Sequence, residues 1–294
     1  MTSSDHRQSR RRLGIALAAL FALPATGIAA DGRLLATGGA TQFEGSAGGG
    51  IVPWAVLSGY GTDTQNGGTA FATRVDTGDY SLDATGVAYT FRNRVELSYA
   101  RQRFGLGELQ RRLTLPVGRF DAEVIGAKVR LGGDLVYTAM PQVSLGVQHK
   151  RQLDFAIPSA VGARDDSGTE VYVAASKLFL GAAFDRHLLL NATLRSTSAN
   201  QAGLLGFGGD RKAGRSLVLE SSVAVLLDPR WAVGVEYRQK PDNLGFARED
   251  DWKDAFVAWF PNKHVAVVAA YADLGSIATL DKQRGPYLSL QASF

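Results

Sequence analysis

The sequence contains no cysteine, which excludes disulfide bonds, thiolate metal sites and cysteine nucleophiles. Histidine is also scarce, with four in 294 residues, and three of these lie beyond the N-terminal region: His149, His187 and His264. Their separation matches no zinc-binding spacing. We therefore expect no bound metal and no cofactor.

Long apolar runs are absent except near the N-terminus, where the sequence resembles a secretory signal. Arg7 and Arg10 to Arg12 form a basic stretch, an apolar run from Leu13 to Leu23 follows, and small residues precede Ala30. The run is about half the ~20 residues that a membrane-spanning helix needs. We predict that residues 1–30 are a removed signal peptide, cleaved near Ala29 or Ala30.

Excess charge is absent from the remaining chain. Setting aside four arginines and Asp5 lowers the basic residues from 32 to 28 and the acidic residues from 28 to 27. A nucleic-acid partner requires a clustered positive field, which this balance does not provide. We expect no nucleic-acid binding.

What the sequence does contain is alternation with a period of two, clearest in its last ten residues, GPYLSLQASF. Alternating side chains lie on opposite faces of a strand, as a strand between lipid and a wet lumen requires. The residues predicted to face outward are Leu288, Leu290 and Phe294, and those predicted to face inward are Tyr287, Ser289 and Gln291. A chain ending on such a strand resembles the C-terminal assembly signal of Gram-negative outer-membrane barrels, with Phe294 as its last residue.

Similar segments recur along the chain and predict about twelve strands. They are 51–62, 81–91, 95–105, 121–131, 143–151, 169–180, 186–196, 216–227, 230–240, 252–260, 264–274 and 285–294. Short and long connections alternate between them, as expected for short periplasmic turns and long outer loops. The sequence thus predicts an all-β protein with a single antiparallel transmembrane β-barrel over residues 51–294, closed by pairing of its last strand with the strand that begins near Ile51.

Residues 31–50 are rich in glycine and only faintly alternating. A lumenal inset or plug, an irregular first hairpin and a flexible linker are all compatible with this composition.

The strand from Arg230 has Trp231 and Tyr237 near opposite ends of its apolar stripe. Six residues at about 3.3 Å each separate them by roughly 20 Å, which suits the two aromatic girdles of a membrane barrel. We predict that both residues belong to the girdles.

The opposite faces of the strands carry polar side chains that we predict to line the lumen. These are Glu96, Lys128, Arg130, Gln148, Lys150, Asn191, Arg195, Glu220, Glu236 and Arg238. They could border a passage for solutes, or they could pair with one another and fill the interior, because twelve strands lie between packed and open barrel sizes.

The stretches GGGIVPWAVLSGYGT (48–62), RVELSYARQRF (94–104) and LPVGRFDAEVIGAKVRLGGD (115–134) resemble signature segments of the outer-membrane protein family named domain of unknown function 3034 (DUF3034). The resemblance implies a Gram-negative outer-membrane barrel and no particular activity.

These observations predict a non-enzymatic outer-membrane protein, first of all a passive pore or uptake channel for small solutes. The expected partners are outer-membrane lipid, lipopolysaccharide and the barrel-assembly machinery. The alternative is a structural or interaction barrel with a filled lumen. A distant third is a lipid hydrolase using His149, for which the sequence supplies no serine or orienting partner by motif.

Overall fold

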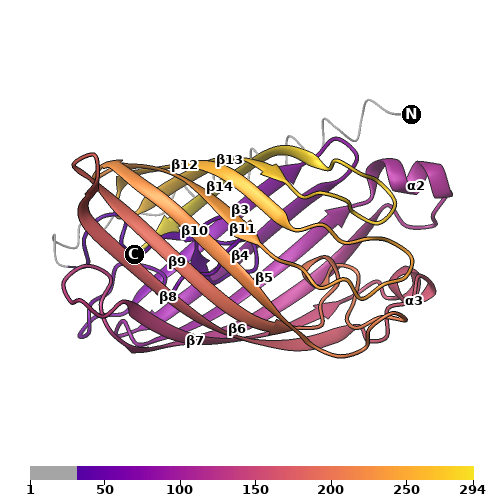
Figure 1. Cartoon of the computed structure of the whole chain (residues 1–294), viewed down its shortest axis with the longest axis horizontal. Helices are drawn as coiled ribbons and strands as arrows, with labels where there is room; N and C mark the ends of the chain where they lie inside the picture. Colours follow the sequence, from indigo (N-terminus) through magenta and orange to yellow (C-terminus); the bar gives the residue numbers. More distant parts are fainter. Residues whose placement is uncertain (1–31) are drawn as a thin grey trace. The chain divides into compact units, whose positions relative to one another are not determined.

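The computed structural model describes residues 32–294, so the predicted signal peptide lies outside the described residues. Twelve strands close into one antiparallel barrel, in which each strand pairs with its neighbour in sequence and β14 pairs with β3 (Figure 1). The strands are β3 (Gly67–Asp76), β4 (Ser81–Phe91), β5 (Val95–Gly105), β6 (Arg119–Gly132), β7 (Gln142–Gln152), β8 (Ser167–Ala183), β9 (Arg186–Thr197), β10 (Ser216–Asp228), β11 (Trp231–Arg238), β12 (Trp252–Asn262), β13 (Val265–Asp273) and β14 (Arg284–Ser293).

The predicted alternation appears as an apolar outer face and a mostly buried inner face. In β5, Leu97 is 48% exposed, whereas the adjacent Glu96 is 1% exposed. Trp231 of β11 stacks on Trp259 of β12, its directly paired residue, with ring centroids 5.7 Å apart. Apolar residues with neighbouring aromatics on the outside suit contact with lipid.

The two ends of the barrel have different connections. At the turn end, defined by residues 92–94, 133–141, 184–185, 229–230 and 263–264, most connections are tight. Arg92, Asn93, Phe184 and Asp185 all have positive φ, as tight hairpin turns between twisted strands require. The loop end comprises residues 77–80, 106–118, 153–166, 198–215, 239–251 and 274–283.

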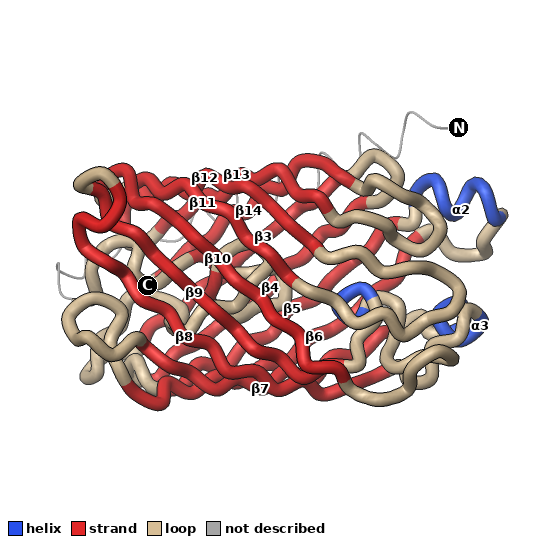
Figure 2. Tube along the Cα trace, viewed as in Figure 1, coloured by secondary structure: helices blue, strands red, loops and turns tan. Residues whose placement is uncertain are grey.

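The loop end also carries the short helices α2 (Gly107–Leu113) and α3 (Ala156–Ala160), as Figure 2 shows. Within residues 32–294, no helix combines the length and apolar character needed to cross a bilayer. The predicted alternation of turns and loops holds apart from the four-residue connection at 77–80 and the longer turn at 133–141.

The predicted first strand is wrong. Residues 51–62 form no barrel strand, and the first strand is β3, which pairs with β14 from Val75↔Tyr287 to Thr69↔Ser293. Residues 51–61 are buried without interruption, whereas a lipid-facing strand exposes every second side chain. The apolar character of this stretch reflects burial inside the barrel.

The closing strand, β14, has the predicted alternation, with Leu290 as the exception in exposure. Phe294 is 63% exposed and Leu288 is 49% exposed, while Tyr287, Ser289 and Gln291 are buried. Leu290, between Ala72 and Val267 in the pairing, is largely covered. Phe294 lies over Gly68, where a Cβ atom would approach its ring to 2.6 Å.

Candidate functional site

The lumen is filled by residues 33–62, which we call the inset. The inset contains the two-residue strands β1 (Ala40–Thr41) and β2 (Ala47–Gly48) and carries Glu44 between them. Its two ends meet, because the Arg33 guanidinium donates to Leu57 O at 2.5 Å and Arg33 N donates to Tyr60 O at 3.0 Å. Tyr60 N also donates to Phe294 O at 3.4 Å, which places this junction at the turn end.

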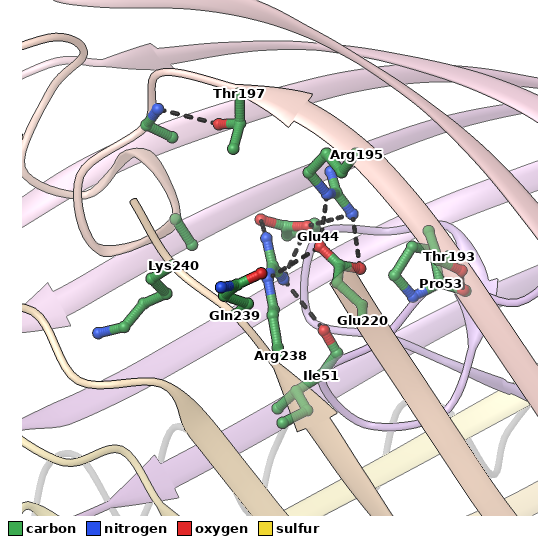
Figure 3. A network of polar contacts seen from close by, with 12 residues as sticks. Glu44, Ile51, Pro53, Thr193, Arg195, Thr197, Glu220, Arg238, Gln239 and Lys240 are labelled. Atoms are coloured by element: carbon green, nitrogen blue, oxygen red, sulfur yellow. Dashed lines mark hydrogen bonds and ion pairs between the residues drawn. The ribbon is translucent and has the colours of Figure 1, made fainter. Parts of the chain in front are cut away.

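Glu44 is the central anchor of the inset. Its Oε1 accepts from Arg238 Nη2 at 2.9 Å, and its Oε2 accepts from Arg238 Nη1 at 3.1 Å. Lys150 Nζ also donates to Glu44, and Arg195 Nη2 lies 3.8 Å from it. Figure 3 shows Glu44 between Arg195 and Arg238, which extend from different strands. Burial opposes ionisation of Glu44, but the cations from the wall together hold its pKa well below the ordinary range.

The wall supplies the other members of this ion network. Arg195 Nη1 donates to Glu170 Oε2 at 2.6 Å and Arg195 Nε donates to Glu220 Oε1 at 2.6 Å. Lys150 Nζ lies 2.7 Å from Glu170 Oε2. The network therefore has three cations and only two carboxylates from the wall, and Glu44 of the inset supplies the third. The charges balance only when the inset is in place.

A second anchor lies nearer the turn end, where Glu96 and Lys128 form an ion pair of 3.3 Å. Lys128 Nζ donates to Ala47 O at 2.9 Å and to Trp54 O at 3.2 Å. Glu96 accepts from Ser58 N at 2.7 Å. This wall pair satisfies backbone groups that the irregular inset leaves without secondary-structure partners.

Glu236 forms a third anchor at the bend of the inset. Its Oε2 accepts from Gly50 N at 2.6 Å and from Ile51 N at 2.8 Å. Its Oε1 accepts from Ser222 Oγ at 2.6 Å. The close fit is visible at Gly49, where a Cβ atom would approach Glu236 Oε1 to 2.0 Å, so a side chain there would displace this anchor.

Polar uncharged residues of the wall bind the inset at Pro53 and Ala55. Pro53 O accepts from Thr193 Oγ1 at 2.8 Å and from Asn191 Nδ2 at 3.3 Å. Ala55 O accepts from Ser144 Oγ at 2.6 Å. Because buried backbone groups need hydrogen-bond partners, these contacts fix the path of the inset through the lumen.

The loops at the loop end contact the ion network around Glu44. Lys150 Nζ donates to Ala202 O at 3.3 Å, in the short helix η1 (Gln201–Gly203). Lys240 and Glu249 form a 2.8 Å ion pair whose side chains are almost fully buried. Burial lowers the pKa of Lys240 and raises that of Glu249, and in both cases the partner's charge opposes the shift.

The structure brings most of the predicted lumen residues to the inset. Nine of them are buried, namely Glu96, Lys128, Gln148, Lys150, Asn191, Arg195, Glu220, Glu236 and Arg238. Arg130 lies apart at the turn end, where its side chain is 15% exposed and donates to Gly133 O at 2.6 Å. Trp231 is 40% exposed on the outer face, and Tyr237 Oη donates to Asp251 Oδ2 at 2.5 Å.

The sequence interpretation missed Glu44 and Glu170. Glu170 has the same parity in β8 as the buried Tyr172 and Ala174, but Lys177 made the outward face of that segment ambiguous. Lys177 in fact turns to the 133–141 turn and donates to Asp134 O at 3.3 Å. No periodic signal marks Glu44, because its neighbours form no regular strand beyond two residues.

Two further features concern catalysis and metal binding. His149 lies on the outer face with its Nδ1 3.0 Å from Thr169 Oγ1. Within residues 32–294, no three histidine or acidic side chains converge in a group that could hold a metal ion.

The strand pairing and the polar lumen define the class of the protein, a closed twelve-stranded transmembrane β-barrel. The chain belongs to the family described as "Protein of unknown function (DUF3034)", whose model matches residues 37–291. The match spans most of the inset as well as the barrel.

No curated protein matches the sequence. Among solved structures, the KdgM porin is 10% identical, with 78% of this chain and 99% of that chain covered and a TM-score of 0.47. The outer-membrane protein Omp33 of Acinetobacter baumannii is 10% identical, with 79% and 97% covered and a TM-score of 0.43. The outer membrane phospholipase A of Escherichia coli is 8% identical, with 81% and 93% covered and a TM-score of 0.37.

Proposed function

We propose that the protein is an outer-membrane channel for small polar solutes that its own inset holds closed. The observation that carries this proposal is the charge balance at Glu44, where a separate segment of chain completes an ion network belonging to the wall. The apolar outer face supports residence in the outer membrane of a Gram-negative bacterium.

The path of the inset supports a removable plug. Both ends of the inset lie at the turn end, so it can withdraw without breaking any strand pairing of the barrel. Its departure would expose the charged and hydroxyl side chains that form part of the inner wall, which water can solvate. The proposed channel is therefore gated by the inset, which adds a closed state to the passive pore or uptake channel expected from the sequence.

A structural barrel is the second candidate, favoured by the number of polar contacts that the inset makes with the wall. A lipid hydrolase is not proposed. Within residues 32–294, the hydrogen-bond partner of the His149 ring is the Thr169 hydroxyl, and the sequence offers no serine motif beside it.

Planar-bilayer recording of the full-length mature protein tests the resting state. We expect a closed baseline with brief, rare current steps, because three separate anchors hold the inset. A steady ohmic current from the unmodified protein would contradict a closing role for the inset. Complete silence of the protein even after removal of the inset would favour the structural barrel.

A further inference from the structure

An apolar cavity of about 470 Å³ lies between the inset and the inner face of strands β8 to β13, at the turn end. Leu189, Leu226, Phe256 and Phe260 line it from the wall, and Trp54 and Val56 line it from the inset. Its volume lies in the range of small-molecule sites, roughly 300–1,000 Å³. It is separate from the ion network around Glu44, none of whose members lines it.

The lining changes character from one end of the cavity to the other. Asp185 lies in a turn at one end of the cavity, and Arg186, His187 and Asp228 lie at the adjoining strand ends. The deeper lining is aliphatic or aromatic up to Gly49 and Gly50. Arg186 is exposed and its guanidinium donates to Leu227 O. The cavity thus has a charged rim and an apolar interior.

Such an interior is unusual for this kind of barrel, in which the lumenal side is normally polar. The same strands obey that rule towards the loop end, where Arg195, Glu220 and Arg238 face inward. An empty apolar cavity costs stability, and it takes up apolar ligands in preference to water. The inner face at the turn end therefore suits an apolar ligand, and the charged rim suits a ligand with one polar end.

We propose that this cavity binds the acyl chain of a single-chain lipid, with the head group among the charged residues of the rim. A free fatty acid and a lysophospholipid share this chemistry. The proposal goes beyond channel function and does not depend on it, because the inset stays in place while the cavity is occupied.

Trp54 provides a fluorescence reporter inside the cavity. Trp231 and Trp259 face lipid, so both are first replaced by phenylalanine, which leaves Trp54 and Trp252. The variant with both replacements is placed in nanodiscs of unbrominated lipid. It is then titrated with a fatty acid brominated in mid-chain and, in a separate experiment, with a lysophospholipid that carries the same brominated chain. We expect saturable quenching that a further Trp54→Phe variant loses.

Matched variants on β12 separate the cavity from the outer face. Ala258 lines the cavity, whereas Ala255 on the same strand is exposed. Ala258→Phe should weaken the saturable quenching at least ~10-fold, equivalent to about 1.4 kcal/mol, and Ala255→Phe should leave it unchanged. If Ala258→Phe does not form a barrel by circular dichroism, Ala224→Val provides a smaller filling of the same cavity.

Quenching by the fatty acid alone would show that the site takes a carboxylate head group. Quenching by the lysophospholipid alone would show that it takes a phosphate head group. Quenching by both would show that the site selects the acyl chain. The proposal is overturned if neither probe quenches Trp54 saturably. It is also overturned if a folded cavity-filling variant binds as well as the Ala255→Phe control.

Discussion

Deletion of the inset, residues 33–62, is expected to convert the closed barrel into a steadily conducting pore. All twelve strands and the β14–β3 closure lie outside the deleted segment. The deletion exposes Glu96, Lys128, Glu236 and the wall members of the ion network to water. Such polar groups favour a hydrated passage. Single-channel recording in planar bilayers measures the effect, with the full-length protein as the control.

The deleted protein also loses the hydrogen bond from Tyr60 N to Phe294 O, so its folding must be checked by circular dichroism before recording. A folded deletion variant that carries no current at any applied voltage would contradict the channel proposal. In that case the barrel's own side chains or loops would fill the lumen, as in smaller barrels.

Replacement of Glu44 by glutamine is expected to release the inset without shortening the chain. The variant keeps the shape of the side chain but leaves Lys150, Arg195 and Arg238 facing only Glu170 and Glu220. Removing one partner from a buried ion pair costs about 3–5 kcal/mol. At about 1.4 kcal/mol per tenfold change, the population of open channels should rise by roughly two to three and a half orders of magnitude.

The matched control is Glu108→Gln. Glu108 also contacts two arginines, Arg111 and Arg112, but the pairs lie in α2 at the loop end with both arginines exposed. Exposed pairs contribute about 0–1 kcal/mol, so this variant should gate like the unmodified protein. Equal open probabilities for the two variants would show that Glu44 does not hold the inset.

The lowered pKa of Glu44 predicts that mild acid does not release the inset as Glu44→Gln does. A carboxylate whose pKa is lowered by folding stabilises the folded state above its ordinary pKa, and the stabilisation is lost only as the pH falls through the lowered value. Mild acid, about pH 5, therefore leaves Glu44 ionised and does not reproduce the effect of Glu44→Gln.

The sequence predicts much of the barrel wall because lipid on one side and polar groups on the other impose a period of two. The bounds predicted for two strands, 81–91 and 95–105, are those of β4 and β5. The first strand was missed because the outward residues of β3 include Ala70, Ala72 and Arg74, which form no strong apolar stripe. The more apolar 51–62 segment has its character from burial on all sides.

The same alternation predicts which residues face inward, but it does not predict which groups they bind. Lys128 and Glu236 are identifiable as lumenal from alternation, whereas their bonds to Ala47 O and Gly50 N depend on an inset without regular structure. Barrel size alone could not decide between a passage and a filled lumen. The contact between Glu44 and Arg238, 194 residues apart in sequence, shows that the inset occupies the lumen.

Protection of a single cysteine provides the most direct test that the inset occupies the lumen. The chain has no cysteine, and Ser46 in the inset is 2% exposed, so Ser46→Cys places one thiol inside the barrel. Ser159→Cys, on the exposed surface of α3, provides the accessible control. With a membrane-impermeant thiol reagent, we expect Cys at 159 to react at once and Cys at 46 to stay protected until Glu44→Gln is added. Equally fast reaction at both positions in otherwise unmodified protein would contradict an inset held in the lumen.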